Sequence, residues 1–249
     1  MQRQFLASLS ILGIIVLFGF TARLNRSASA SPQKIKVISR TNGDEALTAE
    51  LVDDQIRIRL KNNHKSTITA FAISFGNTKV KEDFAYSDVH LGIDPGDTFQ
   101  ASYALSPSPV GELPTLSLLT VLLKDGTNDG DSKVAREIKD ERLGEKIQVL
   151  RMLKILEKEG QSHKDLKLTK SDIVAALNMG EVETLVTLNE LEPTSRIKEK
   201  ISDQLRNGLQ VGREKMLRRF EVLEQLQPEY REQGFMELKE RSHKLFAKL

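Results

Sequence analysis

The chain has no cysteine and no tryptophan, and aromatic residues make up only 5% of its 249 positions. The lack of cysteine excludes a disulfide framework, excludes thiol chemistry and removes the sulfur ligands of structural zinc sites. The fold must therefore be held together by an apolar core.

Sequence motifs for catalysis are absent as well. No serine stands in a G-x-S-x-G pattern, and neither G-x-x-x-x-G-K-[ST] nor G-x-G-x-x-G occurs, so a nucleophile elbow and a phosphate-binding loop are not indicated. None of the histidines, His64, His90, His163 and His243, belongs to a helical zinc-binding pattern with a catalytic context. Most carboxylates alternate with lysine or arginine, which is typical of a solvated face. We therefore expect a protein that is not an enzyme and that needs no cofactor.

The amino terminus has the features of an export segment. Arg3 precedes the uncharged residues 5–22, and Ala-Ser-Ala at 28–30 supplies the small-x-small pattern that signal peptidase cuts after. The uncharged stretch also approaches the length of a membrane span, and two arginines lie between it and the cut site. Residues 1–30 are thus predicted to be either a cleaved signal peptide or, through residues 5–22, an uncleaved anchor. In both cases we expect the rest of the chain in the periplasm or cell envelope, and in the second case on the inner membrane.

The net charge gives no argument for nucleic-acid binding. The formal charge of +2 depends on three arginines in residues 1–30, and removing them leaves 34 basic and 35 acidic residues. A mature chain close to neutrality does not carry the broad positive field that nucleic acids attract.

Residues 31–125 are predicted to form short strands. Segments rich in β-branched and aromatic residues alternate in polarity, most clearly QIRIRL at 55–60, and Asn-Gly, Asp-Asp, Asn-Asn and Asp-Pro-Gly turns separate them. Six or seven strands at this spacing indicate a small antiparallel β-sandwich.

Two stretches resemble Ig-like domains of bacterial envelope proteins. In RIRLKNNHKSTITAFAISFG, an apolar strand ends in asparagine, a polar turn follows, and the next strand carries Phe71; IDPGDTFQASY resembles the later proline-glycine turn of such domains. The resemblance covers about 90 residues and rests on strands and turns, while the cysteines and core tryptophan of antibody-type domains are missing. It implies a fold and a compartment rather than an activity.

Residues 131–249 are predicted to be helical, because the density of charged residues rises and the apolar residues recur at helical spacing. We expect one amphipathic helix from about Ser132 to Glu159, and one or two helices from Ser171 onward with a break near Gly180. A further long helix is expected over residues 195–227, and Pro228 opens the last one. These helices indicate a hairpin or bundle, with a coiled coil as a variant.

The acidic corner at 125–131, DGTNDGD, is the segment that most resembles a site. An EF-hand interpretation fails, because Arg136 stands where the bidentate carboxylate should be and a strand precedes the loop. A looser calcium site with Asp125, Asp129 and Asp131 as ligands remains an alternative. Turn and helix-cap chemistry alone accounts for every residue, so we interpret the corner mainly as a structural hinge between two domains.

Two further patterns have a structural and a functional interpretation. Gly208 and Gly212 form G-x-x-x-G, which indicates either a flat spot where another helix or a partner approaches or a loosened helix; we favour the loosened helix because single helical glycines are tolerated. Residues 57, 59, 61 and 65 form a positive strip beside His64 that could touch an anionic polymer or lipid headgroups. We interpret it as a solvated strand face.

The sequence thus predicts an α+β protein: an N-terminal export segment at 1–30, an Ig-like antiparallel β-sandwich at 31–125 and an α-helical hairpin or bundle region at 131–249. The leading hypothesis is a non-enzymatic envelope protein of the interaction or scaffold type. Its C-terminal helices would bind a protein partner or a second copy. A module that binds glycan or calcium through the loops near His64, His90 and Asp94 is the alternative, and a hydrolase with an unrecognised site is the third hypothesis.

Overall fold

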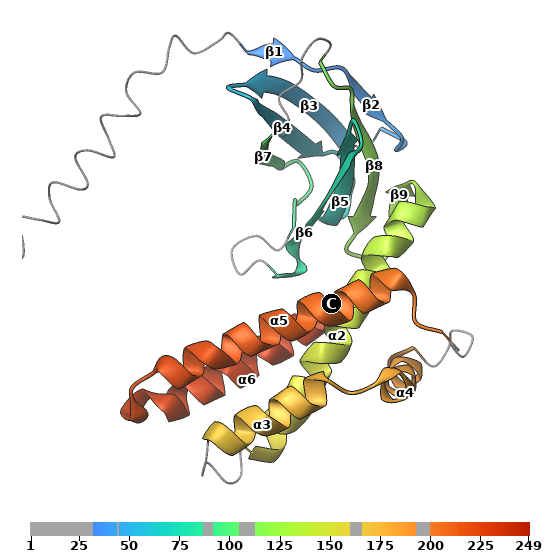
Figure 1. Ribbon diagram of the computed structural model, residues 1–249. Helices are drawn as coiled ribbons and strands as arrows, with labels where there is room; N and C mark the ends of the chain where they lie inside the picture. The colour runs from blue at the N-terminus through green and yellow to red at the C-terminus, as the bar shows by residue number, and fades with distance from the viewer. Residues whose placement is uncertain (1–31, 44, 87–91, 105–112, 160–165, 193–199) are drawn as a thin grey trace, which may run out of the picture.

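The computed structural model describes residues 32–43, 45–86, 92–104, 113–159, 166–192 and 200–249. Over these residues the protein is a mixed α+β fold in which two sheets precede five helices (Figure 1), which confirms the predicted class. The predicted export segment, His90 and His163 lie outside the described residues. No helix among the described residues is both long enough and apolar enough to span a bilayer.

The strands form a four-stranded and a five-stranded sheet. Sheet A has the order β1-β3-β4-β7, and sheet B has the order β2-β8-β5-β6 with β9 added to β8. Most pairs are antiparallel, but β2 runs parallel to β8, so sheet B is mixed rather than purely antiparallel as predicted. The strands are β1 (Gln33–Lys34), β2 (Val37–Ser39), β3 (Glu45–Val52), β4 (Gln55–Asn62), β5 (Ile68–Phe75), β6 (Thr78–Asp83), β7 (Thr98–Ala104), β8 (Leu116–Leu123) and β9 (Asn128–Gly130).

The two sheets share one apolar core. Ile56, Ile58 and Leu60 of β4 are buried against Phe71 and Leu118 of sheet B, while the residues between them on β4 stay exposed. This is the alternation that the sequence predicts for QIRIRL. Strands β5 and β8 are instead buried along nearly their whole length, because both faces of sheet B are covered.

Helix α2 (Ser132–Glu159) covers the outer face of sheet B. Val134, Ala135 and Ile138 pack against alanines and leucines of β5 and β8. The helix then continues without a break into the helical region, where its later turns form the core with the other helices (Figure 1). The observed bounds of α2 match the predicted helix.

The other helices partly match the prediction. They are α3 (Leu166–Leu177), α4 (Glu181–Leu191), α5 (Asp203–Gln225) and α6 (Arg231–Lys248). The break near Gly180 is confirmed, since this glycine is the N-cap of α4. Ser171 lies inside α3 rather than at its start, and the side chain of Ser202 caps α5 instead of a residue near 195.

Four ion pairs join β6 to α2, including a longer one of 3.8 Å between Lys81 and Glu137. Lys79 contacts Glu137 at 2.6 Å, Lys81 contacts Glu141 at 2.6 Å, and Asp83 receives two hydrogen bonds from Arg142. Alternate residues of β6 point to one side of the strand, and residues about four apart share one face of α2. The charged side chains of the two elements can therefore face one another along the contact. The two-sheet domain is therefore fixed to the first half of α2.

Helices α2 and α5 cross closely at glycines. A Cβ atom at Gly208 would collide with the carbonyl oxygen of Glu141, and one at Gly144 would collide with that of Leu205. A Cβ at Gly212 would lie 2.9 Å from the Cα of Glu145. Helix α5 remains continuous through both of its glycines. The interpretation of a loosened helix is therefore wrong, and the flat spot for another helix is the one that the structure supports.

Candidate functional site

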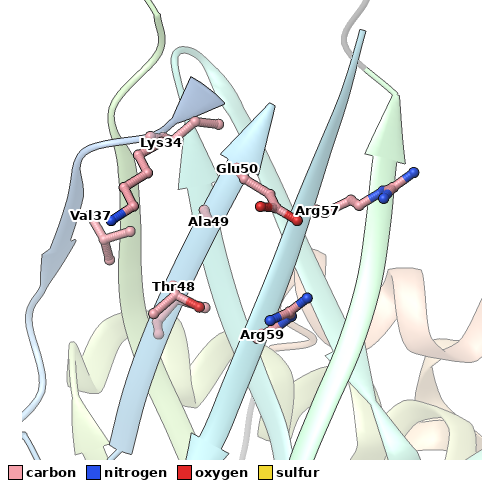
Figure 2. A pocket seen from close by; sticks show the side chains of 9 residues that line it. Lys34, Val37, Thr48, Ala49, Glu50, Arg57 and Arg59 are labelled. Atoms are coloured by element: carbon pink, nitrogen blue, oxygen red, sulfur yellow. The ribbon is translucent and has the colours of Figure 1, made fainter. Parts of the chain in front are cut away.

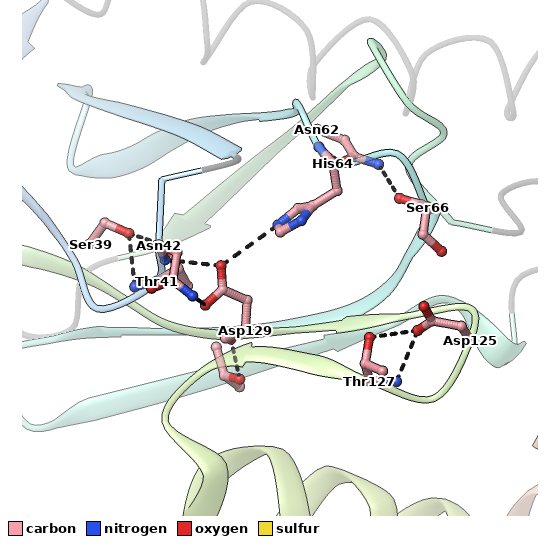
Figure 3. Close-up of polar contacts among 10 residues, drawn as sticks. Ser39, Thr41, Asn42, Asn62, His64, Ser66, Asp125, Thr127 and Asp129 are labelled. Carbon is pink, nitrogen blue, oxygen red and sulfur yellow. Dashed lines mark hydrogen bonds and ion pairs between the residues drawn. The ribbon is translucent and has the colours of Figure 1, made fainter.

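The three carboxylates of the acidic corner each take different hydrogen-bond partners, and Figure 3 shows those of Asp125 and Asp129. Asp125 accepts hydrogen bonds from the hydroxyl and the backbone N–H of Thr127, which lower the pKa of its carboxyl. Asp131 accepts from the N–H groups of Lys133 and Val134 at the start of α2. The turn and cap interpretation therefore describes these two residues, as carboxylates at a helix N-terminus favour the positive end of the helix dipole.

Asp129 differs from its two neighbours because it is buried, with 8% of its surface exposed. Its carboxylate accepts hydrogen bonds of 2.9 and 2.7 Å from the backbone and side-chain nitrogens of Asn42, and His64 Nε2 lies 4.0 Å from it (Figure 3). Its own carbonyl accepts a hydrogen bond from the buried hydroxyl of Thr120. Asp129 thus ties together β9, the segment after β2 and the loop after β4.

The corner is consequently part of sheet B rather than a free hinge. Residues 128–130 form β9, which pairs with β8, and Asp131 donates its N–H to the carbonyl of Leu119. Within the described ranges, no group of three or more His, Asp or Glu side chains is placed to hold a metal ion. The calcium site at Asp125, Asp129 and Asp131 stays a prediction.

The loop after β4 is joined to residues 93–97, because Asn62 donates hydrogen bonds to the carbonyls of Asp97 and Ile93, but His64 and Asp94 take separate side-chain partners. The side chain of His64 is 8% exposed and faces Asp129, whereas Asp94 accepts a hydrogen bond of 2.7 Å from the hydroxyl of Thr67. No specific observation therefore favours the binding-module alternative.

The outer face of sheet A is a basic surface. Arg57, Arg59 and Lys61 alternate with the buried residues of β4 and are exposed. Their register partners on β3 and β7 are neutral and polar or small, except for Glu50, which pairs with Arg57. Glu50 is also the register partner of Lys34 on β1, the strand on the other side of β3. We call these five residues the basic face; it carries four cations and one carboxylate.

A shallow hollow opens at the β1 side of the basic face (Figure 2). Its volume is about 360 Å³, and its lining includes Lys34, Glu50, Arg57 and Arg59 together with Ile35 and apolar residues of β2 and β3. The hollow extends the predicted positive strip toward β1. His64, which the sequence analysis placed beside that strip, is turned into the interior instead.

Helix α4 exposes an apolar strip that the sequence analysis missed. Met179, just before the helix, and Val182 and Val186 within it expose 48%, 72% and 54% of their surfaces. The opposite side of α4 is buried through Thr184, Thr187 and Leu188. The signal was present in the sequence, since a surface helix with apolar residues around most of its circumference has more than one face to cover.

Arg151 is the most buried cation among the described residues of the helical region, at 4% exposure. It donates a hydrogen bond of 2.7 Å to the hydroxyl of Thr184 and a longer one to Gln148, while its Nε has no hydrogen-bond acceptor in the part of the chain that the structure describes. Desolvation lowers the pKa of its guanidinium, opposed by the charge of Glu183. These contacts join α2 to α4, so Arg151 stabilises the packing of the two helices.

Comparisons of the chain with protein-family models, with curated proteins and with solved structures find no match.

Proposed function

We propose that the protein is an exported, non-enzymatic envelope protein of the interaction or scaffold type. Export rests on the sequence of residues 1–30, with residues 5–22 as the signal core or the anchor. The described residues add surfaces suited to binding, namely an exposed apolar strip and a basic sheet face. Helix α2 would hold the two parts of the molecule at a fixed spacing, as a scaffold requires.

The two-sheet domain is proposed to be Ig-like. In Ig-like sandwiches the second and fifth strands pair in one sheet, and the third and sixth pair in the other. Here β4 pairs with β7 in sheet A, and β5 pairs with β8 in sheet B. The chain passes between the sheets from β4 to β5 and again from β7 to β8. This connectivity supports the resemblance, with α2 covering one outer face.

The observation that carries the interaction role is the apolar strip of α4. Valines exposed at 72% and 54% on one helix gain free energy when a partner removes them from water, at about 25 cal/mol per Å² of apolar surface. A second copy of the chain supplies the same strip, and two identical patches related by a twofold axis form a closed dimer. We therefore place self-association at α4.

Light scattering with size-exclusion chromatography tests this placement. The parent chain is expected to dimerise, and Val182→Ser with Val186→Ser is expected to weaken the dimer by at least about tenfold through the lost apolar burial. Val222→Ser, at a valine on α5 that is 61% exposed, is the control and should leave the dimer intact. A strict monomer, with no protein crosslinked to α4 in the envelope, would contradict the proposed role.

A further inference from the structure

The basic face of sheet A combines uncovered cations with a position close to the predicted anchor. Arg57, Arg59 and Lys61 point outward from one strand, and no ion pair of theirs is found among the described residues. The face is formed by consecutive paired strands, and the apolar core lies behind it. Four cations and one carboxylate spread over a sheet face match an extended anionic surface better than a small ligand.

The length of chain before β1 limits where this face can lie. Ten residues separate the end of the predicted anchor at residue 22 from Gln33. Even fully extended, they span at most about 35 Å. Strand β4 lies two positions from β1 in the same sheet, or about 10 Å across the sheet. An anchored chain therefore keeps the basic face within reach of the bilayer surface.

We propose that the basic face docks on anionic phospholipid headgroups of the membrane that holds residues 5–22. This inference rests on the anchoring alternative of the proposed function. Each lysine or arginine near an anionic surface contributes about a fivefold gain in binding, so three such residues contribute roughly 100-fold. The single carboxylate, Glu50, stands between Lys34 and Arg57 in register and is offset by them.

A single-cysteine label tests the docking, since the chain has no cysteine of its own. The full chain with Ser102→Cys, at the position paired with Arg57, is reconstituted into vesicles that carry a quencher on a minor lipid headgroup. The vesicles are either pure phosphatidylcholine or equal parts of phosphatidylcholine and phosphatidylglycerol. We expect the label to be quenched only with phosphatidylglycerol, and the quenching to fall at about 1 M salt, where the Debye length shrinks to ~3 Å. A label at Glu214→Cys on α5 should show no such dependence.

Charge variants distinguish binding through the basic face from a general attraction of the whole protein to anionic lipid. Replacing Arg57, Arg59 and Lys61 by glutamine should lower the ratio of docked to undocked protein by roughly 100-fold. Replacing the exposed Lys133, Arg213 and Arg218 by glutamine removes the same charge elsewhere and should leave the quenching unchanged.

Three results would overturn the proposal, and they differ in what else they affect. Equal quenching of the residue 102 label in both vesicles would sink docking while leaving the anchor intact, provided that the chain floats with the vesicles. A chain that does not float would overturn docking together with the anchoring on which it rests. If polyglutamate but not phosphatidylglycerol engages the label at residue 102, the face would belong to an acidic polymer instead of lipid.

Discussion

At the scale of single residues, burial separates aspartates that look alike in the sequence. Asp125 sits in an exposed turn, whereas Asp129 is buried with two hydrogen bonds from Asn42. Removing a buried acceptor lowers the free energy of unfolding more than removing an exposed one. The donors left behind in the interior cannot form replacement hydrogen bonds to water.

We therefore expect Asp129→Ala to lower the free energy of unfolding by about 2 kcal/mol, and Asp125→Ala by less than about 1 kcal/mol. Urea denaturation measures both values. Equal losses at the two positions would show that the network around Asp129 is not what orders the corner. The same assay with added calcium tests the metal alternative: a calcium-dependent gain in stability that disappears in Asp125→Ala, Asp129→Ala and Asp131→Ala alike would favour it.

Tyr103 supplies a second prediction at this scale. Burial and the hydrogen bond of 2.8 Å that its hydroxyl donates to Glu82 raise the pKa of the phenol well above its usual range. A raised pKa means that this group stabilises the fold below the unfolded value of about 10, and that its contribution is lost as the pH rises beyond it. Tyr103 should thus stay neutral while the protein is folded.

Alkaline titration followed by tyrosinate absorbance measures this directly. The parent and Tyr103→Phe should give the same absorbance change up to the pH at which the protein unfolds. A smaller change in the variant would mean that Tyr103 ionises in the folded state, which the contact with Glu82 forbids.

At the scale of elements, the close crossing of α2 and α5 at glycines predicts whether Gly208→Ala raises or lowers the stability of the protein. Gly208→Ala should destabilise the protein by about 1–3 kcal/mol, because the methyl group meets the backbone of Glu141. A loosened helix predicts the opposite, a gain of about 1 kcal/mol from helix propensity. Gln210→Ala, at an exposed position of the same helix, is the control. Thermal unfolding of the three proteins decides between the two interpretations.

The elements also show what the sequence could predict. The spacing of apolar residues in the sequence was enough to identify β4 and the whole of α2, because one face of each contacts the core and the other contacts water. It could not identify β9, since Asn-Asp-Gly has turn chemistry and becomes a strand only because β8 offers an unpaired edge. It also missed the buried state of Asp129, whose partners Asn42 and His64 are distant in sequence. Contacts of this kind depend on topology, which local patterns do not contain.

At the scale of the whole molecule, α2 belongs to two cores at once. Its first turns pack on β5 and β8, and its later turns pack with α3, α5 and α6. Arg142, near the middle, donates two hydrogen bonds to Asp83 and one of 2.8 Å to the carbonyl of Thr69. Unfolding either part therefore strips one half of a continuous helix of its packing.

The two parts should accordingly unfold in one calorimetric transition. Arg142→Ala should lower the free energy of unfolding by about 2 kcal/mol, since it leaves the carboxylate of Asp83 half-buried without its partner. If the parent shows two separate transitions, the sheets and the helical region are independent domains and α2 does not couple them.

The central claim is that this folded body works outside the cytoplasm through its surfaces. The most direct measurement places the single cysteine of Glu214→Cys in the full chain and exposes spheroplasts to a membrane-impermeant maleimide. The account predicts labelling without lysis, in a protein that sediments with membranes if residues 5–22 are retained. Labelling only after lysis would place the chain in the cytoplasm and contradict the account.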